Sequence, residues 1–182
     1  DGEIIQGVIT ESKSGRQAIL AKRVIDASGD ADIADRAGAP CRKTPKIEMM
    51  GVTTMFSCAD VDKPHFLEYV KANPKTYKDW DESWAVKTSG KEDDIPSNYL
   101  LEPFKQARKD GLIPENVQSI SGSWGGLTDS GEIHFNMIYL LGYDCTDVRD
   151  LTRAEMEGRY SATLAIEALK KYAPGFEKAT LL

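Results

Sequence analysis

The segment Ala21-Lys-Arg-Val-Ile-Asp-Ala-Ser-Gly-Asp-Ala-Asp32 decides how the rest of the chain is interpreted. Its first half is a short run rich in β-branched residues, which predicts a buried strand. Ser28-Gly29-Asp30 ends this run, and residues 33–37 fit one or two amphipathic helical turns. This order of elements places backbone N–H groups and a carboxylate at the C-terminal end of a strand. Ligands of α/β sheets bind at that position, so we expect a binding turn here.

The residues before this segment predict a β-hairpin. Residues 3–10 favour a strand, Ser14-Gly15 favours a turn, and residues 17–25 favour the second strand. The second arm of the hairpin would then run directly into the glycine–aspartate turn. Hairpins are common at sheet edges, and only this connection distinguishes the predicted one from any other.

The composition is typical of a soluble globular protein. The chain has 182 residues, of which 41% are hydrophobic and 29% are charged, enough for one domain with a core. The net charge of −6 argues against a nucleic-acid partner, because phosphate-binding faces carry clustered Lys and Arg. No apolar run approaches the roughly 20 residues that span a bilayer, so we expect no membrane partner.

The three cysteines, Cys41, Cys58 and Cys145, are widely separated and form no Cys-x-x-Cys motif. An odd number without metal-ligand spacing is typical of reduced thiols, so we expect a cytoplasmic protein whose cysteines are structural. A redox pair formed by Cys41 and Cys58 stays open as the alternative.

The central part of the chain predicts a second sheet with helices around it. No Gly-Lys-Ser/Thr follows the glycines at 125–131, so that loop is not a Walker phosphate loop. The expected elements are a loop over 41–48, a strand over 52–58, a helix capped by Asp62 that stops before Asn73, a polar and partly irregular stretch over 75–98, a helix from Pro103 to Gly111, and strands over 117–124 and 132–141 joined by the glycine-rich hairpin loop.

The clearest local signal is a long helix near the C-terminus. Residues 152–155 form a capping box with Leu151 at the staple position, which predicts a helix from Thr152 to about Tyr172. Glu167 and Lys171 are placed for an i,i+4 ion pair on its polar side. The opposite face, predicted to be buried against a sheet, consists of small and apolar residues: Ala154, Gly158, Ser161, Ala162, Ala165, Ala168, Leu169 and Tyr172. We interpret this helix as a support without a catalytic role.

Two polar residues on one predicted strand are candidate catalytic residues. His134 and Asn136 alternate with apolar neighbours, so both side chains lie on the same face. If that face lines a cavity, His134 could donate a proton or orient a substrate carboxylate. The alternative is an exposed or edge-strand face. His65, in the first turn of a helix, is expected to be solvated, and Trp124 is expected to be a core anchor.

The acidic residues at 26, 30, 32 and 35 raise the question of a cation site. A calcium loop needs oxygen ligands at alternating positions, a glycine turn and a distal Glu, and the strand predicted before Gly29 disrupts that spacing. Acidic residues that stabilise a helix N-terminus explain the cluster more simply. We therefore predict no metal site.

The segment at 24–34 resembles the Ala-Thr-Gly-Asp segment of FAD-dependent oxidoreductases of the two-dinucleotide-fold type, with Ser28 in the position of the usual Thr. The resemblance returns at residues 150–159 and 173–179 and covers both ends of the chain better than its centre. It implies that Ser28, Gly29 and Asp30 contact FAD, near its ribityl–pyrophosphate region, and that the substrate is a small molecule.

One part of the family pattern is missing. These flavoproteins seat the FAD pyrophosphate on a Gly-x-Gly-x-x-Gly turn, and no such pattern occurs in the 182 residues. The resemblance therefore implies an internal fragment of a longer oxidoreductase that neither holds FAD tightly nor turns over alone. A stand-alone ligand-binding or protein-interaction domain and a metal-dependent hydrolase are the alternatives.

Together these features predict an α+β fold: a mainly antiparallel sheet backed by helices, forming the substrate-side portion of a flavoprotein. Residues 1–40 would supply the hairpin and the Ser-Gly-Asp turn of a partial nucleotide-binding lobe. Residues 41–182 would form the substrate or cap domain. An unpaired sheet edge would favour self-association.

Overall fold

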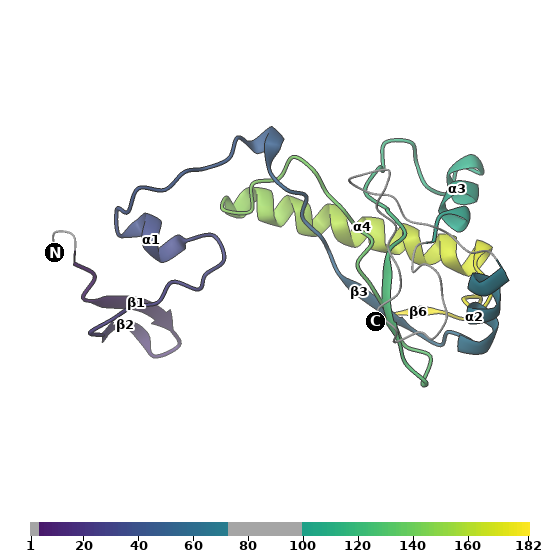
Figure 1. Ribbon diagram of the computed structural model, residues 1–182, viewed down its shortest axis with the longest axis horizontal. Helices are drawn as coiled ribbons and strands as arrows, with labels where there is room; N and C mark the ends of the chain where they lie inside the picture. The colour runs from purple at the N-terminus through teal and green to yellow at the C-terminus, as the bar shows by residue number, and fades with distance from the viewer. Residues whose placement is uncertain (1–3, 73–99) are drawn as a thin grey trace. The chain divides into compact units, whose positions relative to one another are not determined.

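The computed structural model describes residues 4–72 and 100–182, and the chain divides into two compact units, residues 1–45 and 46–182 (Figure 1). The irregular stretch expected over 75–98 lies outside the described residues. Each unit is built around an antiparallel sheet of its own.

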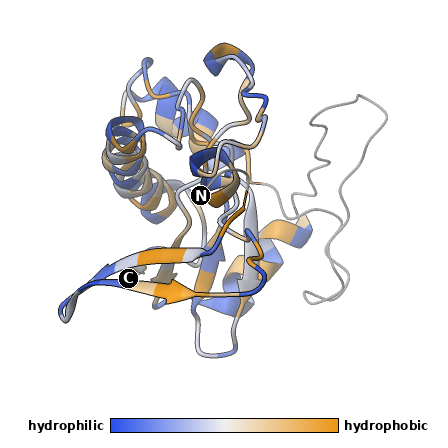
Figure 2. Ribbon diagram, turned by 90° about the vertical axis from the view of Figure 1, so that its left-hand side faces the viewer, coloured by the Kyte–Doolittle hydropathy of each residue, from blue (hydrophilic) through white to orange (hydrophobic). Residues whose placement is uncertain are grey.

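The first unit consists of a hairpin and one short helix. Strands β1 (Gly7–Ser12) and β2 (Gly15–Leu20) pair from Gly7 opposite Leu20 to Ser12 opposite Gly15, and helix α1 spans Asp32–Arg36. Gly15 closes the turn with φ +90°, a conformation that favours glycine. The predicted hairpin is confirmed. Both strands carry hydrophobic segments (Figure 2), yet no residue between 4 and 45 is buried.

The buried strand predicted over residues 21–27 is wrong. Strand β2 ends at Leu20, and the next seven residues belong to no strand, with a bend at Lys22. Ala21 donates a last backbone hydrogen bond to Gln6 O, 2.9 Å away, and Ile25 is 89% exposed. β-branched residues favour a strand only where a partner strand and a covering layer are present, and among residues 4–45 nothing provides either for residues 21–27.

The second unit contains a four-stranded antiparallel sheet in the order β4-β5-β3-β6. Its strands are β3 (Phe56–Ala59), β4 (Trp124–Leu127), β5 (Ile133–Phe135) and β6 (Thr180–Leu181). The hairpin of β4 and β5 is confirmed with shorter strands than expected, and Gly125 and Gly126 belong to β4 instead of the loop. Isolated bridges between Val52 and Leu140 and between Ile120 and Ile138 continue the pairing beyond these strands.

Two short helices of this unit follow the predicted start signals. Helix α2 (Lys63–Ala72) begins after Asp62, whose carboxylate accepts a hydrogen bond from His65 N at 3.1 Å. Helix α3 (Glu102–Lys109) begins with Pro103 in its first turn and is followed by Gly111 at φ +73°. A short 3₁₀ helix, η1, spans Lys46–Glu48 within the segment that was expected to be a loop.

The long helix α4 spans Val148–Tyr172 and starts one turn earlier than the capping box predicts. The N-cap is Asp147, whose carboxylate accepts a hydrogen bond from Arg149 N at 2.7 Å. Thr152 lies inside the helix, where its hydroxyl donates to Val148 O at 2.7 Å, so it caps nothing. The staple expected at Leu151 is also wrong, because this side chain is half exposed.

The small-residue face of α4 packs tightly within the second unit, as predicted. Seven of the eight residues expected on this face are buried, and Tyr172 is partly buried. A Cβ added at Gly158 would stand 2.6 Å from Thr54 Cβ, so only glycine allows this approach. Ser161 Oγ and Ser119 Oγ form a buried hydrogen bond of 2.8 Å. On the polar face the expected i,i+4 ion pair is replaced by Glu167 with Lys170, at i,i+3.

The core of the second unit joins α4, α2 and α3 to the sheet. Three aromatic rings meet in it: Phe66 contacts Trp124 and Phe176 edge-on, with centroid distances of 5.1 and 4.9 Å. Trp124 is 1% exposed, so the expected core anchor is confirmed. The fold is thus α+β with antiparallel sheets, as the sequence predicts. None of the described helices is both long and apolar enough to cross a membrane.

Candidate functional site

The turn at Ser28-Gly29-Asp30 is organised by the carboxylate of Asp26. One oxygen of Asp26 accepts hydrogen bonds from Ser28 N at 3.0 Å and Ser28 Oγ at 2.7 Å, and the other accepts from Ala34 N at 2.9 Å. Ser28 Oγ in turn accepts from Asp32 N at 2.8 Å. These bonds, the Ser28 hydroxyl first, hold the pKa of Asp26 below its ordinary value. One aspartate and one hydroxyl therefore tie the chain before the turn to the start of α1.

The φ angles of the turn backbone alternate in sign. Gly29 has φ +92° and Ala31 has φ +59°, with Asp30 between them. Glycine adopts a positive φ freely, whereas the left-handed conformation at Ala31 costs about 1–2 kcal/mol. Successive N–H groups in such an alternating backbone converge on one side, an arrangement that binds anionic groups.

The turn presents donors and an acceptor that the described residues do not use. Within residues 4–72 and 100–182, nothing accepts a hydrogen bond from the N–H of Gly29 or Asp30, and the Asp30 carboxylate has no partner. Apart from Gly29 and its two chain neighbours, no described residue has an atom within 4 Å of the point where a Cβ at Gly29 would stand. The turn thus offers N–H donors, a carboxylate and free space to a ligand that carries both acidic and hydroxyl groups.

A hollow of about 710 Å³ lies between the hairpin and α1 of the first unit. Ile9 and Ile33 give it apolar walls, and Arg16 and Arg36 add positive charge. Ser28, Gly29 and Asp30 do not line it. The hollow and the turn are therefore separate features of the unit.

His134 lies in β5 and Asn136 just past its end, and the two keep the alternation of exposure that the sequence predicts. Both are exposed, while Ile133, Phe135 and Met137 between and beside them are buried. The His134 ring is not isolated: its Nδ1 lies 2.6 Å from Ser57 Oγ on the neighbouring strand β3. The two candidate residues thus share a solvent-facing polar surface with Ser57, a residue that the sequence did not single out.

Ser57 could have been found only through strand register. Ser57 stands directly opposite His134 in the antiparallel pair β3–β5. Directly opposed side chains have Cβ atoms about 4.5–5.5 Å apart, close enough for a hydrogen bond. The sequence predicts both strands but not the register between two segments separated by more than 70 residues.

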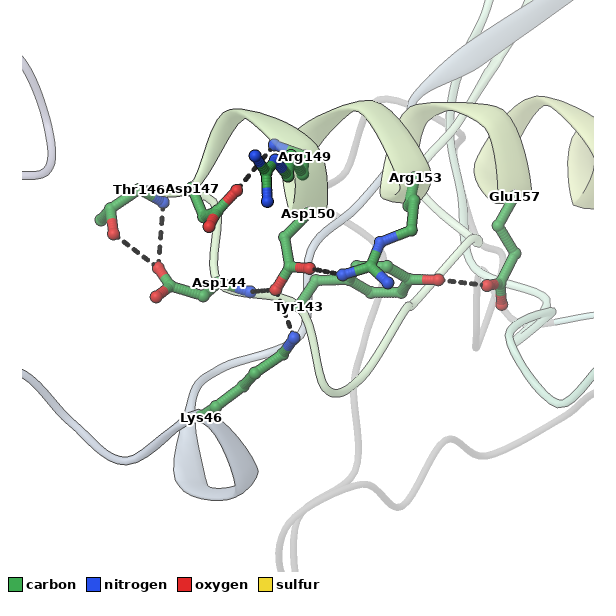
Figure 3. Close-up of polar contacts among 9 residues, drawn as sticks. All are labelled: Lys46, Tyr143, Asp144, Thr146, Asp147, Arg149, Asp150, Arg153 and Glu157. Atoms are coloured by element: carbon green, nitrogen blue, oxygen red, sulfur yellow. Dashed lines mark hydrogen bonds and ion pairs between the residues drawn. The ribbon is translucent and has the colours of Figure 1, made fainter.

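The start of α4 contains a charged cluster that the sequence reasoning also missed (Figure 3). Asp150 is only 4% exposed, and its carboxylate contacts Lys46 Nζ and Arg153 and accepts a hydrogen bond from Asp144 N at 3.0 Å. The Lys46 contact is the main cause that holds the pKa of Asp150 well below its usual range. The cluster ties η1, the chain before α4 and the first turns of α4 together.

The remaining candidates are accounted for without a ligand. Burial raises the pKa of the Cys58 thiol to about 12, so this cysteine is not a thiolate at neutral pH and a redox pair with Cys41 is disfavoured. His65 is exposed in the first turn of α2, as expected. Among the described residues, no group of three His, Cys, Asp or Glu side chains could hold a metal ion.

Of the three comparisons with known proteins, the one with family models gave a match. The family model of FAD-dependent oxidoreductases matches residues 1–182, the whole chain. The searches of curated proteins and of solved structures gave no match. On the strength of this match over its full length, the chain belongs to the FAD-dependent oxidoreductase family.

Proposed function

We propose that this chain is part of an oxidoreductase that transfers electrons between FAD and a small-molecule substrate, and that the Ser28–Asp30 turn contacts the FAD. The observation that carries the proposal is the turn itself, whose N–H donors, free carboxylate and open space occur in a chain of an FAD-dependent family. The first unit would be a partial cofactor lobe, and the second unit would face the substrate.

The residues of the turn suit FAD by the chemistry of their donors. FAD carries phosphate oxygens, which accept hydrogen bonds from N–H groups, and ribityl hydroxyls, which donate to a carboxylate. The N–H groups of Gly29 and Asp30 would donate hydrogen bonds to the phosphate oxygens. The Asp30 carboxylate would accept a hydrogen bond from a ribityl hydroxyl. Asp26 and Ser28 would hold the turn in shape, since their bonds fix its backbone from inside.

FAD supplies the redox chemistry when it is bound, so the protein need provide only placement, exclusion of water and a proton route. In this proposal the substrate meets His134 on the exposed face of β5 and Asn136 just past the end of that strand. Their side chains can donate hydrogen bonds to a carbonyl or carboxylate oxygen. Because FAD would carry the redox chemistry, the protein would need no nucleophilic residue, and the sequence shows no motif for one.

The pyrophosphate of FAD would be held mainly by residues outside the 182 positions, because no Gly-x-Gly-x-x-Gly pattern occurs among them. We therefore expect the purified chain to remain colourless after it is mixed with FAD and desalted. A yellow, stoichiometric complex would contradict this part of the proposal.

The contact with FAD is tested in the chain linked to a segment that carries the pyrophosphate-binding glycines. Gly29→Ala should lower the FAD content of the purified protein, because a side chain would occupy the space offered to the cofactor. Gly15→Ala is the matched control: both glycines have φ near +90° and no atom within 4 Å of the added Cβ. Equal FAD content in the two variants would show that the Ser28–Asp30 turn does not contact FAD.

Asp30→Asn provides the second test of the same contact. It keeps the size of the side chain but replaces the charged acceptor of a ribityl hydroxyl by a neutral amide oxygen, so FAD affinity should fall about tenfold, the difference between a charged and a neutral hydrogen bond. Asp35→Asn, an exposed aspartate of α1, is the control and should leave affinity unchanged.

A further inference from the structure

Strand β4 contains a bulge directly opposite His134. Between the residues that pair at its two ends, β4 has Gly125 and Gly126, where β5 has only His134. This two-to-one count defines a β-bulge, a feature that occurs often at sheet edges and beside active sites. The strand is also at the edge of its sheet. The bulge, here called the glycine bulge, therefore places two residues without side chains next to a candidate site residue.

The described part of the chain gives no structural reason for glycine at these two positions. Neither Gly125 nor Gly126 has the positive φ that favours glycine. Apart from Gly126 and its two chain neighbours, no described residue has an atom within 4 Å of a Cβ added at Gly126. At Gly125 the corresponding contact is His134 O at 3.6 Å, an ordinary van der Waals distance. Because glycine in a strand is less stable than alanine, the bulge gives up stability that the fold does not require it to give up.

The glycine bulge leaves open space beside His134. The residues on either side of the two glycines, Trp124 and Leu127, are buried, whereas the added Cβ atoms would face open space. On the other side of His134, Ser57 Oγ lies 2.6 Å from Nδ1, so the imidazole is held towards β3 and does not cover the glycines. A strand glycine often marks a place where a ligand or another backbone comes close.

We propose that Gly125 and Gly126 form the floor of a ligand site on the exposed sheet face, where a flat conjugated group that carries a carbonyl oxygen lies against the bare backbone beside His134. This inference rests on the proposed function, in which the substrate meets His134 and Asn136, and it names the class of substrate. Peptide planes without side chains offer a flat surface, so a flat group contacts it over its whole face and a puckered ring at fewer points. The Asn136 amide can donate a hydrogen bond to the carbonyl oxygen.

The test compares two probes that differ in shape alone. Benzamide has a flat ring and an amide oxygen, and cyclohexanecarboxamide carries the same amide on a puckered ring. Each is titrated into the ¹⁵N-labelled full chain without FAD, and the NMR signals are followed. Benzamide should shift the signals of Gly125, Gly126 and the Asn136 side chain in a saturable way, with a Kd on the order of 1–10 mM. Cyclohexanecarboxamide should bind about tenfold more weakly.

Substitutions in the glycine bulge separate binding from folding. Gly126→Val fills the proposed floor, so it should weaken the binding of benzamide about tenfold. It should leave the temperature of thermal unfolding unchanged or raise it, because the space is open and valine suits a strand. Gly126→Ala, with a smaller effect in the same direction, covers the case in which the valine variant does not fold. Gln17→Val adds the same side chain to the exposed strand β2 and should leave binding unchanged.

The contrary outcomes are distinct from failure of the proposed function. The absence of a saturable shift at the glycine bulge, equal affinity for the two probes, or equal affinity of Gly126→Val and the unmodified chain would overturn the inference. A change in the sedimentation of Gly126→Val without a change in benzamide affinity would assign the bulge to a contact between two copies of the chain, and would also overturn it. None of these measurements involves FAD, so the proposed contact at Gly29 would still stand. Equal FAD content in Gly29→Ala and Gly15→Ala, conversely, would leave the binding of benzamide as expected.

Discussion

The two units of the chain differ in what they bury. In residues 4–45 no side chain is buried, and Ile9, Leu20 and Ile25 are 64%, 79% and 89% exposed. In the second unit a continuous core joins the sheet to its helices, with Phe66 and Phe135 fully buried. Apolar residues are present in both units, so composition does not explain the difference. What differs is the presence of a second layer to pack against.

This comparison indicates that the first unit exposes a surface on which another element packs. A two-stranded hairpin is at best marginally stable alone, and contiguous exposed apolar side chains mark a surface that another element covers. The exposed isoleucines of the hairpin and the unpaired residues 21–27 are consistent with the proposed partial cofactor lobe. The second unit has a continuous core of its own, which joins its sheet to its helices.

The largest expected effect comes from removing a core ring of the second unit. Phe66→Ala should lower the free energy of unfolding by about 3–5 kcal/mol, because it leaves a cavity between Trp124 and Phe176. Ile9→Ala in the hairpin is the matched control, and its effect should stay within about 0.5 kcal/mol. Urea denaturation measures the free energy of unfolding of both variants. Similar losses in the two would contradict the difference in burial between the two units. Phe66→Leu covers the case in which the alanine variant does not fold.

A smaller loss is expected where α4 approaches the chain before β3. Glycine to alanine inside a helix normally adds stability, by up to about 1 kcal/mol. Gly158→Ala should instead cost about 1–3 kcal/mol, because the new methyl group would overlap Thr54. Gly126→Ala, with no atom within 4 Å of the added Cβ, is the control. Thermal denaturation that shows a gain for Gly158→Ala would disprove the close approach.

The next effect appears only in acid. The pKa of Asp150 is lowered in the folded chain, chiefly by Lys46, so the unfolded chain takes up this proton first as the pH falls. The stability that Asp150 contributes is therefore complete above the ordinary Asp pKa, near pH 4, and is lost as the pH falls through the lower folded value. Asp150→Asn should flatten this part of the curve. Stability below about pH 4 is followed by circular dichroism. If its pH dependence is the same in Asp150→Asn as in the unmodified chain, the charged cluster around Asp150 does not contribute to stability.

The smallest effect is expected in the turn of the first unit. Ser28→Ala removes the hydroxyl that bridges Asp26 and Asp32 N. Because no residue between 4 and 45 is buried, the free energy of unfolding of the chain as a whole should change by less than about 0.5 kcal/mol. The change should instead appear in the NMR signals of residues near the turn. A large loss of global stability would mean that the two units unfold as one.

The sequence predicts those parts of the fold whose signals are local. The hairpin follows from Ser14-Gly15, α2 from Asp62, and the buried face of α4 from its spacing of small residues. The start of α4 was predicted one turn late because Asp147 and Thr152 both have capping side chains. Only the structure shows that the Thr152 hydroxyl is used inside the helix.

The sequence fails where the outcome depends on distant partners. Residues 21–27 have the composition of a buried strand, yet the described residues give them no partner strand. For the candidate site, the sequence placed Gly29 in a turn and His134 and Asn136 on one face. It could not supply Ser57 or Lys46, whose roles depend on register and on packing between segments far apart in the chain.

Amide hydrogen exchange, measured residue by residue on the intact chain, tests the central contrast most directly. Protection reflects the local free energy of opening. Amides of β3, β5 and the buried part of α4 should exchange only through global unfolding, while those of β1 and β2 should exchange with little protection. Equal protection in the hairpin and in α4 would contradict the account, because it would mean that the first unit is stable without a covering layer.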